Sequence, residues 1–253
     1  MLGIGTGLLH LDVKPFQPND VSSLEAHFSS NYGLLLTGTA NGEVRRWSDI
    51  SGNNYRLEPT NTNTRPNVTT TAAGIVAGAP KVQFTATGTA DVLELLDSGG
   101  DPAAITLDTS DAGYCVVVVY TSANWDDGKI VIGNTDNADN HILHKSGANA
   151  FTLKAGGTAK DFSLDTPSSL TDDNLVSIMF NSNSSGDTTL YVNNIAQTDT
   201  ESNSADFVIS QVGAGNDTGN MTGSIKQIII YNKALSDAER NLVYDYVYEH
   251  ITR

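Results

Sequence analysis

The chain has 253 residues, which is enough for one all-β domain with a substantial core. It carries 14 Lys and Arg against 29 Asp and Glu, and the resulting net charge of −15 is spread along the chain. This charge repels phosphate backbones and anionic head groups, so we expect neither nucleic acid nor a membrane surface as a partner. Gly, Ser, Thr, Asn and Asp are abundant, and these residues favour turns between strands.

The single cysteine, Cys115, lies in the apolar run "YCVVVVY", so no disulfide can form within the chain. A secreted domain of this size more often carries disulfides, which favours assembly in a reducing cytoplasm. The start "MLGIGTGLLHLDVK" has no basic region before its short apolar stretch, so no signal peptide is predicted. No apolar run approaches the roughly 20 residues of a membrane-spanning helix.

Residues 1–19 form the first predicted unit, an N-terminal arm. Glycines, prolines and scattered leucines give this stretch as a whole no clear helical or strand period. Its apolar side chains would be a liability in water, so we expect them to dock on a partner; they are Leu2, Ile4, Leu8, Leu9 and Leu11. The alternative is a first strand that docks on its own domain, and the sequence does not separate the two.

Residues 20–253 form the second predicted unit. Its first stretch, "DVSSLEAHFSS", fits either a capped turn of helix or a strand. Twelve short apolar runs follow, from "YGLLLTG" to "SIKQIIIYN", separated by clusters of Gly, Asn, Asp and Thr. Runs at this spacing predict an all-β fold of two packed antiparallel sheets, a sandwich or jelly roll. The continuous stretches "VVVV" and "IIIY" are typical of strands buried on both faces.

The last segment predicts an α-helix packed on the sandwich. Ser236 and Glu239 form an S-x-x-E capping box, in which each residue satisfies a backbone N–H of the other. Apolar residues then recur at three- and four-residue steps: Ala238, Leu242, Val243, Tyr246, Val247 and Ile251. We therefore expect one stripe of this helix to lie along a sheet.

No arrangement typical of a catalytic site is present in the sequence. A glycoside hydrolase needs two carboxylates across a cleft, and none of the glutamates stands in an E-x-D-x-x-E pattern. Asp91, Glu94 and Asp97 fall three apart, which places neighbours on opposite faces of a strand. A thiolate at Cys115 would be costly, and the five histidines have no zinc-binding spacing. We therefore predict that the protein is not an enzyme.

The two tryptophans are candidates for stacking on a sugar ring. Trp47, in "RRWSDISGNNYRL", lies in a strand-like run, so packing is the favoured interpretation. Trp125, in "SANWDDGK", stands beside a turn and is harder to bury, which makes it the better candidate. The predicted carbohydrate-binding residues are Trp125, Asp126, Asp127 and Tyr55. The alternative is that Trp125 packs under a loop.

One loop has the composition of a calcium site. The stretch "NTDNADN" places five carboxylate or amide side chains close together: Asn134, Asp136, Asn137, Asp139 and Asn140. Calcium prefers six to eight oxygen ligands, so this is the one cofactor that the sequence suggests. An EF-hand is excluded, because Asp139 stands at the sixth position in place of glycine. The alternative is a polar hairpin loop without a metal.

Three segments resemble concanavalin A-like, laminin-G-like jelly-roll domains. They are "VRRWSDISGNNYRLEPTNTNTRPNV" followed by "GAPKVQF", then "DTTLYVNN", then "GSIKQIIIYNKALSDAERNLVYDYV". The patterns W-x-D-x-S-G-N and Y-N-x-x-L-S-x-x-E are specific, and the resemblance extends from residue 20 to residue 251. It implies a two-sheet jelly roll with the C-terminal helix packed on it. It also implies that Trp47 packs in the core, that Asp49 and Ser51 form a turn, and that Gly52 has a positive φ.

The start "MLGIGTGLL" resembles the first residues of structural proteins of tailed phages. This resemblance implies a non-enzymatic virion protein, a capsid decoration or tail-associated component that displays the jelly roll. Such a protein is assembled in the host cytoplasm, and its partners are other virion proteins and further copies of itself. The alternative function is a carbohydrate-binding module that recognises cell-surface glycans. A glycoside hydrolase is the least favoured function.

Overall fold

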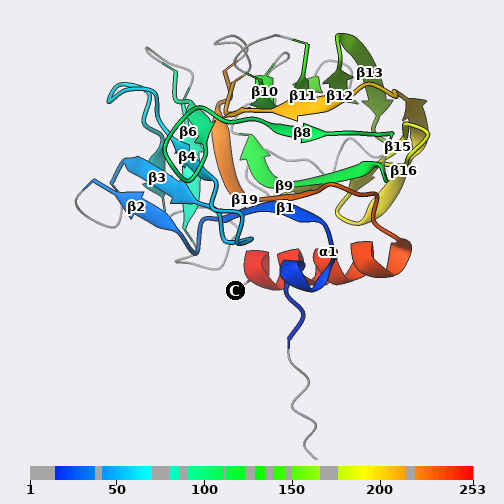
Figure 1. Ribbon diagram of the computed structural model, residues 1–253, viewed down its shortest axis with the longest axis horizontal. Coiled ribbons are helices and arrows are strands. Elements are labelled where there is room, and N and C mark those ends of the chain that lie inside the picture. The colour runs from blue at the N-terminus through cyan, green and yellow to red at the C-terminus, as the bar shows by residue number, and fades with distance from the viewer. Residues whose placement is uncertain are drawn as a thin grey trace, which may run out of the picture.

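The structure of the chain is a computed structural model. It describes residues 15–37, 42–69, 80–85, 90–110, 112–122, 129–134, 139–145, 150–165, 176–214 and 220–252. These residues form three antiparallel sheets and one α-helix near the C-terminal end (Figure 1). The predicted fold class, an all-β sandwich with a helix packed on it, is therefore confirmed.

The first large sheet contains eight strands. They are β1 (Leu24–Ser29), β5 (Asn67–Thr69), β6 (Lys81–Phe84), β9 (Tyr114–Ser122), β14 (Val176–Ser182), β15 (Asp187–Val192), β16 (Ile195–Ser202) and β19 (Gly223–Tyr231). Their order is β16-β15-β14-β9-β19-β6-β5, and β1 pairs with β19 as well. The N-terminal part of β19 pairs with β6 and its C-terminal part pairs with β1. The two halves of β19 therefore have different neighbours on one edge, whereas β9 pairs with both halves on the other edge.

The second large sheet contains nine strands. They are β2 (Leu34–Leu36), β3 (Val44–Ser48), β4 (Arg56–Glu58), β7 (Leu93–Leu96), β10 (Lys129–Gly133), β11 (His141–Lys145), β12 (Ala150–Ala155), β13 (Thr158–Ser163) and β18 (Gln211–Val212). Their order is β13-β12-β11-β10-β18-β7-β4-β3-β2. A separate two-stranded sheet consists of β8 (Ile105–Leu107) and β17 (Phe207–Ile209).

The central strands β9 and β19 of the eight-stranded sheet are buried on both faces, which explains the continuous apolar runs. In β9, Val116 and Val118 belong to the main core, which also contains residues of the nine-stranded sheet. Val117 and Val119 belong to a second cluster that contains Val243 of the C-terminal helix. Because side chains alternate along a strand, a strand covered on both faces needs apolar residues at consecutive positions. The expectation for "VVVV" is confirmed.

The C-terminal helix, α1 (Asp237–Thr252), lies across the face of this sheet that is turned away from β10, β11 and β12 (Figure 1). The predicted capping box is present. The backbone N–H of Ser236 donates to the Glu239 carboxylate at 3.0 Å, and the N–H of Glu239 donates to Ser236 Oγ at 3.4 Å. These bonds satisfy N–H groups that the first turn of a helix otherwise leaves unpaired.

The predicted apolar stripe of α1 is wrong at two positions. Val243, Tyr246 and Val247 are buried as expected. Ala238 and Leu242 are exposed, because only a narrow part of the helix surface contacts the sheet. On one flank, the guanidinium of Arg240 lies over the Tyr191 ring at 4.2 Å. The opposite flank, which carries Leu242, faces a groove.

Each of the twelve predicted runs contains at least one strand. The stretch that fitted a helix or a strand contains β1, and only Pro18–Asp20 before it forms a short 3₁₀ helix, η1. Several strands were not predicted. The strands β4, β5 and β8 have three residues each, and β13 and β16 are mostly exposed, so none of them produces an apolar run.

Candidate functional site

The first wall of the candidate site is the segment just before β1. Phe16 packs edge-on against Tyr246 of α1, with ring centroids 6.5 Å apart. The hydroxyl of buried Tyr231 donates to the carbonyl oxygen of Pro18 at 3.2 Å. The side-chain amide of Asn19 donates to the carbonyl oxygen of Ser51 at 3.1 Å. Residues 15–19 of the predicted arm are therefore attached to the domain, whereas Leu2, Ile4, Leu8, Leu9 and Leu11 lie outside the described residues.

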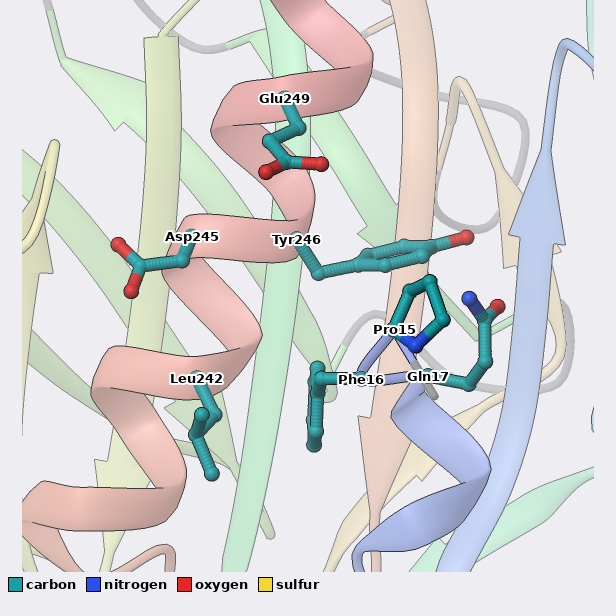
Figure 2. Close-up of a pocket in the computed structure, with 7 residues that line it drawn as sticks. All are labelled: Pro15, Phe16, Gln17, Leu242, Asp245, Tyr246 and Glu249. Carbon is teal, nitrogen blue, oxygen red and sulfur yellow. The ribbon is translucent and has the colours of Figure 1, made fainter. Parts of the chain in front are cut away.

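A groove of about 440 Å³ lies between this segment and α1 (Figure 2). Its lining comes from both ends of the chain: Pro15, Phe16, Gln17, Leu242, Asp245, Tyr246 and Glu249. Figure 2 shows the Tyr246 ring extending from α1 over the Pro15–Gln17 segment, while the Asp245 carboxylate points away from that segment. We call this site the α1 groove.

The α1 groove combines an apolar surface with two carboxylates. Leu242 is 45% exposed beside the packed rings of Phe16 and Tyr246. The Tyr246 ring also lies 5.7 Å from the His27 ring, so it is held from two sides. Burial, with a smaller effect of Tyr32, raises the pKa of Tyr246 to about 12, so its hydroxyl stays neutral at physiological pH. The described residues that line the groove include no Ser, Cys, Lys or His, and such a surface suits binding of an apolar segment.

The sequence did not predict the α1 groove. The apolar periodicity places both Leu242 and Tyr246 in the buried stripe of the helix, and Phe16 falls within the predicted arm. Asp245 and Glu249 stand four residues apart on the same flank of α1 as Leu242, which a helical projection shows. The facing wall, however, is far away in sequence, so no local pattern reveals it.

The turn that follows Trp47 has a structural role. Trp47 is fully buried and packs edge-on against Phe28, with ring centroids 6.0 Å apart. Asp49 Oδ1 accepts hydrogen bonds from the backbone N–H groups of His27 and Ser51, both at 2.8 Å. Gly52 has φ +105°. The expectations for packing, for the turn and for the positive φ are confirmed, and Trp47 is not available to a sugar.

The described part of the predicted carbohydrate set is Tyr55. This residue is partly buried against the main core, and its hydroxyl donates to Glu25 Oε1 at 3.1 Å. Burial, then the charge and hydrogen bond of Glu25, raises the pKa of Tyr55. Trp125, Asp126 and Asp127 lie outside the described residues, so the structure does not place them relative to Tyr55.

The stretch predicted to bind calcium connects β10 and β11, which form a hairpin. Asn140 is buried, and its Oδ1 accepts hydrogen bonds from the backbone N–H groups of Gly156 and Val208, both at 3.2 Å. Asn134 is also buried, and its Oδ1 accepts from Ser210 Oγ at 3.2 Å. These amide oxygens hold neighbouring segments together, and calcium binding by the stretch stays a prediction.

Asp139 is the one other residue of that set that the structure describes. Asp139 forms an ion pair with Lys154 Nζ at 3.1 Å. Asp136 and Asn137 lie outside the described residues. Among the residues that the structure describes, no three His, Cys, Asp or Glu side chains come together as a metal-binding group.

Many of the described carboxylates serve the fold. Asp91 is buried and accepts hydrogen bonds from the N–H and Oγ1 of Thr85, both at 2.7 Å, while burial raises its pKa. Asp97 accepts from the N–H groups of Gly100 and Asp101, and these bonds lower its pKa. Burial raises the pKa of the Cys115 thiol, so this group stays protonated. None of these groups forms a nucleophile–base pair.

Residues 97–239, more than half of the chain, match the sequence model of the Laminin_G_3 family, described as the concanavalin A-like lectin/glucanases superfamily. The chain belongs to this superfamily. The matched residues contain β8 to β19 and the start of α1, whereas β1 to β7 of the two large sheets precede them in sequence. No curated protein matches the chain.

Similar solved structures are binding domains of clostridial toxins. The binding domain of Paraclostridial Mosquitocidal Protein 1 is 17% identical with a TM-score of 0.58, and the match covers 92% of this chain and 53% of that chain. The binding domain of botulinum neurotoxin DC, solved with rat synaptotagmin II, is 16% identical with a TM-score of 0.55, covering 91% and 52%. The same domain solved with SialylT is also 16% identical, with a TM-score of 0.55, and the match covers 90% of this chain and 52% of that chain.

At these identities the likeness shows a shared fold. The concanavalin A-like chain spans about half the length of the toxin binding domains that it matches. The superfamily description names both lectins and glucanases, whereas the three solved neighbours are binding domains. No described helix has the length and apolar character needed to cross a membrane.

Proposed function

We propose that this concanavalin A-like domain is a non-catalytic binding module. The observation that carries the proposal is the α1 groove, a preformed apolar site whose exposed Leu242 has no covering group among the described residues. Several described carboxylates are engaged in hydrogen bonds and ion pairs within the fold, as Asp91 and Glu58 illustrate. The solved structures of similar fold are also binding domains, which supports the same class.

Within this class we propose a structural component of a tailed-phage particle, a capsid decoration or tail-associated protein that displays the jelly roll. The support is the resemblance of "MLGIGTGLL" to the starts of such proteins, together with the single buried Cys115. Mass spectrometry of purified particles tests the proposal. We expect the chain in particles at a stoichiometry that survives gradient purification and high salt. Its absence from such particles overturns the virion assignment and leaves the binding module intact.

The second candidate function is carbohydrate recognition. It is favoured by the lectin description of the superfamily and by the toxin binding domain that was solved with SialylT. A glycan array with the purified chain tests it, with Trp125→Ala as the test variant. Loss of binding in this variant, with an unchanged melting temperature, supports a site around Trp125. A blank array, or binding that survives the substitution, ends this proposal.

A further inference from the structure

The loop between β7 and β8 contains the one Asp–Pro bond of the chain, Asp101–Pro102. Both residues are exposed to solvent. Within the part of the chain that the structure describes, the side-chain carboxylate of Asp101 has neither a hydrogen-bond partner nor an ion pair. This carboxylate is therefore free to turn toward the carbonyl carbon of its own backbone.

The loop holds the carbonyl group of this bond in place. The carbonyl oxygen of Asp101 accepts a hydrogen bond from the backbone N–H of Asp97 at 3.0 Å. In return, Asp97 Oδ1 accepts the N–H groups of Gly100 and Asp101 at 2.8 and 3.0 Å. On the other side of the bond, Pro102 forms a β-bridge with Leu96. A donor thus already points at the oxygen on which negative charge develops when the carbonyl carbon is attacked.

Cleavage of a peptide bond by its own aspartate needs a free carboxylate, a polarised carbonyl group and a leaving nitrogen that accepts a proton. The first two are present at Asp101. Intramolecular attack by a carboxylate held beside its target is much faster than attack from solution. Pro102 supplies the third, because its tertiary-amide nitrogen is more basic than the nitrogen of other peptide bonds. Proline also restricts the residue before it to extended conformations, which limits the backbone freedom of Asp101.

We propose that the chain cleaves itself between Asp101 and Pro102 in mild acid. A carboxylate oxygen of Asp101 bonds to its own backbone carbonyl carbon, and the charge moves to the carbonyl oxygen, where the Asp97 N–H stabilises it. The bond to the Pro102 nitrogen then breaks; its electron pair stays on the nitrogen, which takes a proton from the solvent. Water opens the resulting cyclic anhydride, which restores the Asp101 side chain and leaves a carboxylate at the new C-terminus. The net reaction consumes a water molecule and needs no oxidant or reductant.

Mild acid suits both steps of this reaction. The attack needs an ionised carboxylate and the departure needs a proton at the nitrogen, so the rate should be greatest at about pH 4, where aspartates begin to lose their charge. The loop persists there, because the hydrogen bond from the Asp101 N–H is the main cause that lowers the pKa of Asp97. Asp97 therefore keeps its carboxylate, and with it the order of the loop, as the pH falls.

The two fragments should stay together after cleavage. The strands β1, β6 and β7 lie before the break, whereas their partners β18 and β19 lie after it. The large sheets therefore still join the two parts of the chain. The product is a nicked domain with a new N-terminus at Pro102, and the fragments should separate only in denaturant.

Mass spectrometry of the purified chain after incubation at about pH 4 tests the proposal. We expect fragments of residues 1–101 and 102–253, whose masses add up to the chain plus a water molecule. The native chain should react at least about tenfold faster than the denatured chain at the same pH, because only the folded loop holds the Asp97 N–H at the carbonyl oxygen. Asp101→Ala should not react, and Pro102→Ala should react at least about tenfold more slowly. Both residues are exposed, so circular dichroism should show both variants folded.

The Glu58–Pro59 bond is the matched control within the same sample. It also joins an acidic residue to proline, but Glu58 is paired with Arg46 and Arg56 at 2.7 and 3.2 Å, and its longer side chain closes a larger ring. No fragment that ends at residue 58 is expected. A native chain that stays intact, equal rates in the native and denatured chains, cleavage of Asp101→Ala, or equally fast cleavage after Glu58 overturns the proposal.

Discussion

Asp49 holds β1 to the turn after β3, since its Oδ1 accepts the backbone N–H of His27 at 2.8 Å. The same oxygen accepts the N–H of Ser51, and Oδ2 accepts the Ser51 hydroxyl at 2.6 Å. His27 is 1% exposed, so this carboxylate satisfies a backbone donor that water does not reach. One aspartate therefore organises a turn and connects strands of the two large sheets.

Replacement of this carboxylate should be costly. We expect Asp49→Ala to lower the free energy of unfolding by about 2 to 3 kcal/mol, because it leaves the buried His27 N–H unpaired. Asp49→Asn keeps an oxygen acceptor and should lose less than half as much. Urea unfolding followed by circular dichroism measures both. An Asp49→Ala variant as stable as the natural chain would contradict this role of Asp49.

Substitution of Trp47 separates packing from sugar binding. Trp47→Ala removes a fully buried indole from the core and should cost roughly 3 to 5 kcal/mol. Trp47→Phe should cost clearly less, because a ring remains against Phe28 and the indole N–H has no hydrogen-bond partner among the described residues. Chemical denaturation gives the ranking. Equal losses in the two variants would mean that the N–H matters more than the ring.

Alanine substitutions at Gly113 and Gly52 compare a steric clash with backbone strain. Both glycines have a positive φ, but only at Gly113 would a Cβ contact other atoms. Gly113 has φ +76°, and a Cβ there would lie 2.0 Å from the Ser182 carbonyl oxygen. Gly52 has φ +105° with no atom within 4 Å of its Cβ position. We expect Gly52→Ala to cost about 1 kcal/mol from backbone strain alone and Gly113→Ala at least about 2 kcal/mol more. Thermal unfolding of the two variants side by side checks the order.

Burial of Lys226 should make the free energy of unfolding depend on pH above about pH 8. Its side chain is 1% exposed, its Nζ has no hydrogen-bond partner in the described part of the chain, and burial lowers its pKa to about 8. Between this value and the ordinary value of 10.5, the unfolded chain binds the proton more strongly than the folded chain. The free energy of unfolding should therefore rise with pH in that window.

The measurement is urea unfolding at pH 7.5 and 9.5. Between these two pH values we expect the free energy of unfolding to rise by about 2 kcal/mol for the natural chain. The rise should be smaller, or absent, for Lys226→Met. Above about pH 10 the buried tyrosines act in the opposite direction, because unfolding lets them ionise. The comparison is therefore confined to lower pH. A parallel pH profile in the two chains would show that Lys226 is not the group responsible.

Removal of divalent cations should have no effect on stability. The Oδ1 atoms of Asn134 and Asn140 accept hydrogen bonds within the fold, so these bonds hold both residues in place without a metal. We expect the melting temperature to be the same with a chelator and with added calcium, as differential scanning calorimetry would record. An increase with calcium would contradict this expectation.

Local chemistry was readable from the sequence. The capping box at Ser236 and Glu239, the turn at Asp49 and the positive φ of Gly52 each depend on residues a few positions apart, and all three are present. The long continuous apolar runs also identified β9 and β19. A strand that is covered on both faces needs apolar residues at consecutive positions. Short or exposed strands, such as β4 and β16, carry no such signal.

The sequence by itself thus determined the fold class, the main strands and the helix start, because hydrophobic periodicity and capping are local properties. Only the tertiary structure showed that Phe16 and Tyr246, from opposite ends of the chain, meet to form the α1 groove. It also showed that Leu242 is exposed and that Asn140 is engaged by Gly156 and Val208. Hydrophobic periodicity predicts which face of a helix or strand is apolar. How much of that face is covered depends on contacts with segments that are distant in sequence.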